Sequence, residues 1–310
     1  MPEATLGGSA AAISAGDRAE PGTDGTPRRG GESRGGPETA LGGAELAEIG
    51  LRFEVGGEIA TITMDRPGKR NAQTFATWSA LARIGRTLPE HVRVVVIRGE
   101  GPSFSAGIDL RMFSPEGLPG QGSFASAAAL DGETFLARIT EAQQGFLWLR
   151  RPDIVSIAVV QGHAIGAGFQ LALSCDLRIL ADDAKFCMKE PALGLVPDLT
   201  GTKPLVEIVG VAKAVEICLT ARNVGAEEAL RLGLADRVVP RAQLDEAVGE
   251  LAAALLTTDR DAAAATKRLL LGAPERTLEE QCAAERAEQA VRLQALFGKA
   301  GAEGNGSAHS

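Results

Sequence analysis

Hydrophobic residues form several distinct patterns along the middle of the chain, and each pattern predicts a different element. Residues 51–65 (LRFEVGGEIATITMD) alternate apolar and polar side chains around a Gly-Gly pair, which predicts a β-hairpin. Residues 74–88 (TFATWSALARIGRTL) show helical spacing and end before a proline. Residues 92–99 (VRVVVIRG) and 153–160 (DIVSIAVV) are short runs rich in β-branched residues, which is typical of buried strands.

Helices and strands continue to alternate in the second half of the chain. Residues 169–180 (FQLALSCDLRIL) begin with helical spacing and pass into a strand, and residues 202–220 are helical in pattern. From residue 244 to residue 297 the spacing is helical except at 272–274. This alternation predicts an α/β fold with a helical C-terminal region. A dinucleotide-binding fold is disfavoured, because no G-x-G-x-x-G follows the first strand and no P-loop motif occurs.

Composition divides the chain into a core and two tails. Residues 1–48 consist mainly of Gly, Ala, Pro, Ser and Glu, and they contain too few large apolar residues to offset the entropy of ordering. We therefore expect a disordered tail at 1–48, a core with the functional site at 49–243 and a helical region at 244–300. The Gly-rich residues 301–310 predict a second disordered tail.

Charge and cysteine usage exclude several classes of function. The net charge is −8. Residues 1–48 contain eight acidic and four basic residues, so this tail carries −4 and the rest of the chain carries the other −4. Without a basic stripe we expect no nucleic-acid partner, and without a run of about 18 apolar residues we expect no membrane span. The N-terminus does not resemble a secretory signal, and the four scattered cysteines indicate buried thiols in a cytoplasmic protein without a metal site.

Two Gly- and Ala-rich turns follow the two apolar strands. The first contains SFSAGIDL at 103–110, and the second contains QGHAIGAGFQLALSCDL at 161–177. Such turns leave backbone N–H groups uncovered, and a helix that begins there adds partial positive charge. We expect the two turns to offer one N–H each to a small anion, such as a developing oxyanion. Ser103 and Ser105 lie in no G-x-S-x-G elbow, so a serine hydrolase is disfavoured.

Four motifs occur in an order that resembles the crotonase superfamily, the enoyl-CoA hydratase/isomerase family. They are FSAGIDL, QGHAIGAGFQLALSCDLRI, FCMKEPALGLVPDLTGTKPL and GAEEALRLGLADRVVP, and the similarity covers about residues 51–240. The resemblance implies a spiral of repeated strand-strand-helix units and assembly into homotrimers or hexamers. It also implies an acyl-CoA thioester substrate, with coenzyme A as part of the substrate and no separate cofactor.

The resemblance places an oxyanion hole at the N–H groups of Ile108 and Ala167. The CoA-contacting positions that it implies are Arg70, Ala72, Ala106, Asp109, Leu110, Phe297 and Lys299. Asp109 precedes a predicted helix and is also suited to capping it. His163 is expected to be structural.

Three side chains are candidates for the chemistry. Family hydratases carry two glutamates, and the resemblance places the first at Gln170, an amide that cannot exchange protons usefully but can orient water or substrate. The second falls on Glu190, whose pKa we expect a partly apolar site to raise. Asp198 follows eight residues later, where it could serve the chemistry or cap a helix near Thr200.

The count of carboxylates leaves the reaction open between isomerisation and hydration of an enoyl-CoA. One glutamate suffices to move a double bond, because the same group can remove and return a proton, so isomerisation is slightly favoured. A second possibility is a non-catalytic acyl-CoA binding protein that has lost the first carboxylate. A third is a scaffold that uses the fold for assembly alone.

Overall fold

The computed structural model describes residues 40–298 of the chain. The predicted tail at 301–310, most of the tail at 1–48 and the candidate Lys299 lie outside these residues. The first helix of the described residues, α1 (Gly43–Ile49), begins six residues before the expected boundary at residue 49. The difference arises because Leu46 of this helix is buried in the hydrophobic core.

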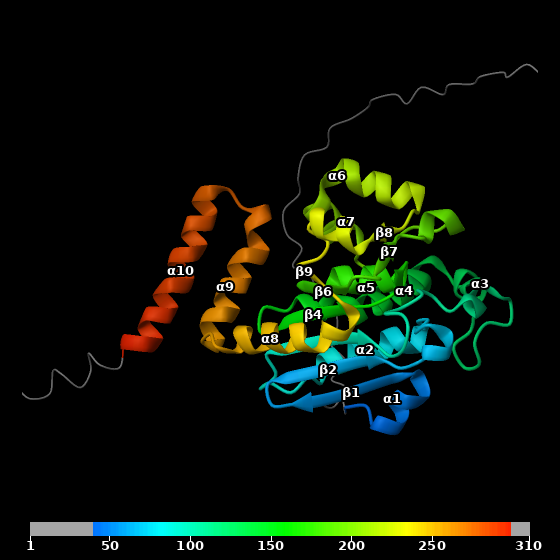
Figure 1. Cartoon of the computed structure of the whole chain (residues 1–310), viewed down its shortest axis with the longest axis horizontal. Helices are drawn as coiled ribbons and strands as arrows, with labels where there is room; N and C mark the ends of the chain where they lie inside the picture. The colour runs from blue at the N-terminus through cyan, green and yellow to red at the C-terminus, as the bar shows by residue number, and fades with distance from the viewer. Residues whose placement is uncertain (1–39, 299–310) are drawn as a thin grey trace, which may run out of the picture. The chain divides into compact units, whose positions relative to one another are not determined.

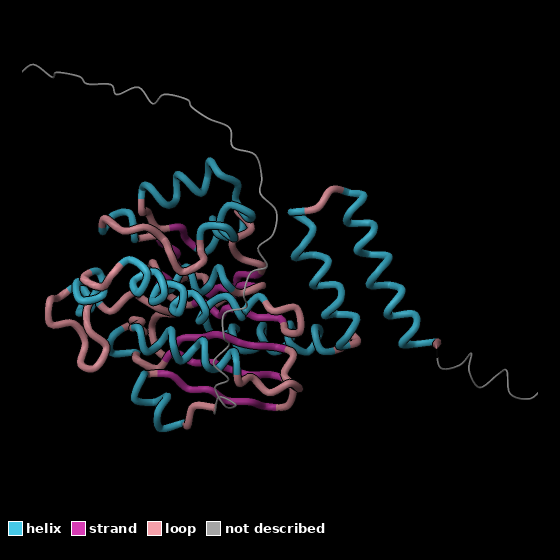
Figure 2. The backbone as a smooth tube through the Cα atoms, turned by 180° about the vertical axis from the view of Figure 1, so that it is seen from behind, coloured by secondary structure: helices cyan, strands magenta, loops and turns pink. Residues whose placement is uncertain are grey.

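A six-stranded sheet forms the centre of the fold (Figures 1 and 2). A second sheet has three strands, which come between strands of the large sheet along the chain. The large sheet has the order β1-β2-β3-β4-β6-β9, with β1 antiparallel to β2 and the remaining pairs parallel. Its strands are β1 (Leu51–Gly56), β2 (Ile59–Met64), β3 (Val94–Gly99), β4 (Val155–Val160), β6 (Leu177–Ala181) and β9 (Arg237–Val239). The small sheet contains β5 (His163–Ile165), β7 (Lys185–Cys187) and β8 (Val224–Gly225).

Helices lie between the strands along the chain, and the last three helices follow the final strand, β9. After α1 they are α2 (Phe75–Arg86), α3 (Phe124–Ala128), α4 (Gly132–Leu147), α5 (Ala167–Ser174), α6 (Thr202–Thr220), α7 (Ala226–Arg231), α8 (Leu244–Leu256), α9 (Arg260–Gly272) and α10 (Leu278–Phe297). The arrangement is an α/β fold with a helical C-terminal region, as the resemblance to the crotonase superfamily implies. The expected hairpin, the helix at 74–88 and both buried strands are confirmed.

Both faces of the large sheet are covered, which explains the unbroken apolar runs in its central strands. In β3, Val95 and Ile97 belong to the main core, whereas Val94 and Val96 face a second cluster that includes residues of α8. Parallel strands covered on both sides read as continuous hydrophobic segments rather than as alternating ones. The strand ends that carry the two Gly-rich turns are therefore held by packing on two sides.

Three features of the helices differ from a simple pattern. The segment 114–132, which is rich in Gly, Ser and Ala, contains the short helix α3, whose first turn is closed by a Ser123–Ser126 capping box. Gly210 interrupts α6 with φ +74°. No side chain of the helix α10 is fully buried among the described residues. The preceding helix α9 is anchored by Lys267, which donates to the carboxylate of Asp176, between α5 and β6.

Candidate active site

The two Gly-rich turns lie against each other at the ends of β3 and β4. The Ser105 N–H donates to the His163 carbonyl at 2.9 Å, and the Ile165 N–H donates to the Ser105 carbonyl at 3.0 Å. Gly107 has φ +89°, and a Cβ there would lie 2.6 Å from the Ile165 carbonyl oxygen. Only glycine fits this approach without movement of the backbone.

Two backbone amides are left without partners where the turns meet. The N–H groups of Ile108 and Ala167 make no hydrogen bond within residues 40–298. Ala167 is the first residue of α5, whose N-terminal N–H groups lack partners within the helix. Both residues line one cavity of about 270 Å³, and Glu190 lines it as well. The cavity therefore places a pair of neutral donors beside a carboxyl group.

Glu190 lies in this wall with one oxygen held and the other free. Its side chain is 4% exposed, and Oε1 accepts a hydrogen bond of 2.7 Å from Gln170 Nε2. Its Oε2 is buried without any hydrogen-bond partner among the described residues. Burial raises the pKa of Glu190 above its ordinary value, and the nearby Asp198 carboxylate adds to that effect. A buried carboxyl group in a cavity wall, with one oxygen unpaired, suits proton transfer.

Gln170 does not line the cavity. It is fully buried on α5, and its Oε1 accepts hydrogen bonds from the N–H groups of Leu199 at 2.8 Å and Gly201 at 3.3 Å. With Nε2 on Glu190, the amide has partners on both sides. The sequence analysis named Gln170 as a candidate catalytic residue. In the structure it contacts Glu190 but does not line the cavity.

Asp198 lies on the wall of a second cavity and does not cap a helix. The helix α6 has Gly201 as its N-cap and no side-chain cap, so the capping alternative is wrong. Burial raises the pKa of Asp198 above its ordinary value, although part of the side chain remains exposed. Glu190 and Ile108 line the same cavity, so both carboxyl groups border one space.

This second cavity has a volume of about 270 Å³ and walls that are mainly apolar. Four aromatic rings contribute to it, from α2, α3 and α4: Phe75, Trp78, Phe124 and Phe135. Sequence reasoning missed these residues, although the amphipathic pattern at 74–88 indicated that one face of that helix is buried. A space of this kind suits a hydrocarbon group.

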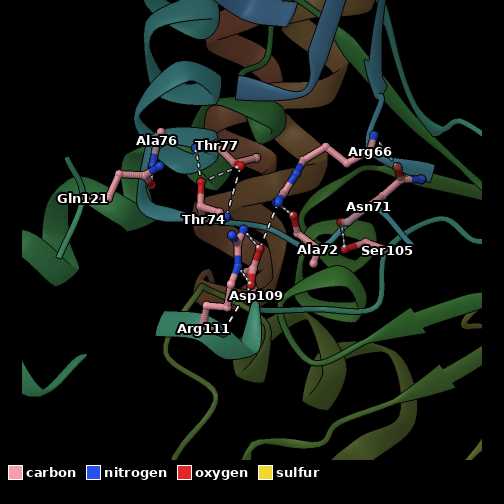
Figure 3. A network of polar contacts seen from close by, with 10 residues as sticks. All are labelled: Arg66, Asn71, Ala72, Thr74, Ala76, Thr77, Ser105, Asp109, Arg111 and Gln121. Atoms are coloured by element: carbon pink, nitrogen blue, oxygen red, sulfur yellow. Dashed lines mark hydrogen bonds and ion pairs between the residues drawn. The ribbon is translucent and has the colours of Figure 1, made fainter. Parts of the chain in front are cut away.

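An ion-pair network holds the loop at 66–73 against the first turn (Figure 3). The Asp109 carboxylate accepts from Arg66 and from Arg111, each at 2.9 Å, and Arg66 also donates to the Ala72 carbonyl at 2.7 Å. Hydrogen bonds from Arg111, then from Arg66, hold the pKa of Asp109 well below its usual range. Asp109 also caps the 3₁₀ helix Leu110–Phe113, as predicted. Arg66 was missed by the sequence analysis.

The remaining candidates fall into two groups. The Ala106 N–H donates to the Arg70 carbonyl at 2.8 Å, which joins the first turn to the loop at 66–73 that contains Arg70 and Ala72. The Arg70 side chain is exposed, and Leu110 is 71% exposed at the rim of the first cavity. Phe297, by contrast, is 65% exposed at the end of α10 and lines neither cavity.

His163 forms part of β5, where its Nδ1 lies 3.4 Å from the Ser103 hydroxyl. Within residues 40–298, no group of three or more His, Cys, Asp or Glu side chains could hold a metal ion. No helix in that part of the chain is both long and apolar enough to cross a membrane.

Comparison with known proteins identifies the family. The family model for enoyl-CoA hydratase/isomerase matches residues 54–296. The chain belongs to this family. The carnitinyl-CoA dehydratase of Escherichia coli K12 is 36% identical over 233 residues, which cover 74% of this chain and 83% of that protein.

Solved structures of related proteins agree with this assignment. A candidate enoyl-CoA hydratase of Thermobifida fusca YX, in complex with acetoacetyl-CoA, is 57% identical with a TM-score of 0.79, covering 82% of this chain and 99% of that one. A CoA complex from the same organism is also 57% identical, with a TM-score of 0.80 and coverage of 84% and 98%. The first of these two structures contains a CoA thioester and the second contains CoA.

Proposed function

We propose that this chain is an acyl-CoA enzyme in which the N–H groups of Ile108 and Ala167 bind the thioester oxygen while Glu190 carries a proton. The observation that carries the proposal is that Ile108 and Ala167, whose amides are unpaired, line one cavity together with Glu190, whose buried Oε2 atom has no hydrogen-bond partner among the described residues. Related proteins of known structure bind acetoacetyl-CoA and CoA, which supports a thioester ligand.

The chemistry follows from where charge develops. Glu190 Oε2 removes a proton from the carbon next to the thioester, and the electron pair of that C–H bond moves onto the thioester oxygen. The two amides stabilise the resulting enolate, and each such donor typically contributes about 10²–10³-fold in rate. When the same proton returns two carbons further along, the double bond has moved and Glu190 is regenerated.

Hydration or dehydration of an enoyl-CoA is the other reaction of the site. It requires a group that handles water at the carbon two positions from the thioester, and Asp198 is the available carboxyl on the cavity wall. The relatives named carnitinyl-CoA dehydratase favour this type of reaction. The single carboxylate at the proposed oxyanion hole favours isomerisation. Because Gln170 stands where family hydratases have a glutamate, the alternative is a non-catalytic acyl-CoA binding protein.

Substrate would extend in two directions from the oxyanion hole. The acyl group would occupy the aromatic cavity, and the CoA moiety would leave along Ala72, Ala106, Leu110 and the exposed Arg70, which can bind phosphate. Coenzyme A belongs to the substrate, and no further cofactor is needed for these steps. We also propose a cytoplasmic homotrimer or hexamer, in which the exposed apolar residues of α10, including Phe297, are covered.

The test uses the purified full chain with 3-enoyl-CoA and 2-enoyl-CoA substrates of several lengths. Ultraviolet absorbance of the conjugated thioester reports both isomerisation and hydration. Glu190→Gln should abolish turnover while the Kd for a CoA thioester changes little, because the amides and the acyl cavity remain. Full turnover in this variant would remove Glu190 from the mechanism. If the wild type bound the thioester without turning it over, the chain would be a non-catalytic acyl-CoA binding protein.

A further inference from the structure

The orientation of the Gln170 carboxamide is determined by its neighbours. Two backbone N–H groups, those of Leu199 and Gly201, point at one end of the amide, and only an oxygen can accept from them. The nitrogen must therefore face Glu190, whose Oε1 it meets at 2.7 Å. The same amide thus contacts the proposed proton carrier and the backbone of a separate loop.

That loop has an unusual backbone conformation. Thr200 has φ +70°, which is rare for a β-branched residue, and its hydroxyl lies 2.8 Å from the Ser174 hydroxyl on α5. The Gln170 oxygen binds the N–H groups on both sides of Thr200. A Cβ at Gly201 would lie 2.6 Å from Gln170 Cγ, so the turn packs directly on this side chain. Such a conformation persists only where the surroundings hold it.

We propose that Gln170 is a positioning residue that acts through Glu190. Its Nε2 engages Oε1 of Glu190 so that only Oε2 is free toward the substrate, and its Oε1 fixes the Thr200 turn that carries Asp198 on the cavity wall. One amide thereby sets the geometry of both carboxyl groups that border the acyl cavity. The inference rests on the proposed role of Glu190 as the proton carrier.

The electrostatic surroundings of Glu190 make the donated hydrogen bond consequential. The other titratable groups near it are Asp198, Cys187 and Cys218, with Lys189 adjacent in the chain. Burial and Asp198 both favour the protonated carboxyl, whereas the hydrogen bond from Gln170 favours the ionised one. Removal of that donor should therefore raise the pKa of Glu190 and release the carboxylate from its fixed orientation.

The decisive variant is Gln170→Met, which keeps the length of the side chain and removes both hydrogen-bonding ends. We expect kcat to fall about 10²-fold, as for a reacting group displaced by about 1 Å, with KM changed only a few-fold. The acid limb of the kcat–pH profile should move to higher pH, because the base must be ionised. An unmoved limb would overturn the proposal.

A second variant decides the question if Gln170→Met does not fold. Gln170→Glu keeps an oxygen for the N–H groups of Leu199 and Gly201 but can donate to Glu190 only while it holds a proton. Its activity should fall as the pH rises through the pKa of that proton, which gives an alkaline limb that the wild type lacks. A profile without this limb contradicts the proposal.

The matched control is Ser174→Ala, which removes a hydroxyl bonded to Thr200 and to the Gln170 backbone carbonyl but keeps the side-chain contact between Gln170 and Glu190. It should lower Tm without moving the acid limb of the kcat–pH profile. A shift equal to that of Gln170→Met would show that the hydrogen bond from Gln170 to Glu190 is not the cause, and would contradict the proposal. Glu190→Gln separates the two proposals. If it retains turnover, the proposed function fails; if it is inactive while Gln170→Met keeps the wild-type limb, only the role of Gln170 fails.

Discussion

Gly107→Ala tests the proposed oxyanion hole directly, because it displaces the backbone amide of Ile108, which a substitution of Ile108 itself would leave in place. The new Cβ would lie 2.6 Å from the Ile165 carbonyl oxygen, closer than a carbon and an oxygen approach without bonding, so the turn must shift. The N–H of Ile108 follows Gly107 in the chain and moves with it. Ala167 N also lies near this Cβ, at 3.8 Å, so the perturbation occurs where the two turns meet.

The size of the effect can be bounded from the geometry. Loss of one oxyanion donor costs about 10²–10³-fold in kcat, or about 2.7–4 kcal/mol. The residue also has φ +89°, where any L side chain adds about 1–2 kcal/mol of strain to the folded state. We therefore expect kcat to fall by at least about 10²-fold, accompanied by a smaller loss of stability.

Gly57→Ala is the matched control for the strain. Gly57 also has a positive φ, +59°, but a Cβ there meets no atom within 4 Å, and it lies in the β1–β2 hairpin. Its Tm should fall by about 2–4 °C per kcal/mol of strain, with kcat unchanged. Steady-state turnover of an enoyl-CoA and thermal unfolding are measured for both variants. A Gly107→Ala protein that keeps wild-type kcat would refute the assignment of the Ile108 amide.

Three further predictions concern charged groups. Because burial raises the pKa of Glu190, turnover should fall as the pH drops through that raised value, as seen in a kcat–pH profile. Asp109→Asn should lower the free energy of unfolding by about 2 kcal/mol in urea titrations at neutral pH; the depressed pKa means that the wild type loses this contribution as the pH falls, so the difference should shrink in acid. Lys267→Met leaves the Asp176 carboxylate buried without its cation and should destabilise the protein by about 3 kcal/mol, measured by urea unfolding with Lys267→Arg as the control.

Elements defined by local pattern could be predicted from the sequence. The hairpin, α2 and the buried strands β3 and β4 follow from side-chain spacing over a few residues. The two turns were recognised because small residues after a strand leave backbone exposed. Glu190 was found through its motif, and the structure gives its environment.

Features that depend on distant contacts could not be predicted in this way. Arg66 reaches Asp109 across 43 positions of sequence, and nothing local to either residue indicates the pair. The aromatic cavity is formed by rings from three helices, one of which, α3, lies in a segment rich in Gly, Ser and Ala. The partners of Gln170 come from the Thr200 turn, whose conformation is imposed by packing rather than by residue preference.

The use of main-chain amides at the meeting of the two turns has a consequence for saturation mutagenesis. Every amino acid except proline supplies an N–H. Whether a replacement of residue 108 or 167 is tolerated would therefore depend largely on how its side chain packs. Intolerance would instead concentrate at the neighbouring glycines, whose missing Cβ atoms allow the approach. A tolerance map of this protein would therefore mark the proposed donors by the positions beside them.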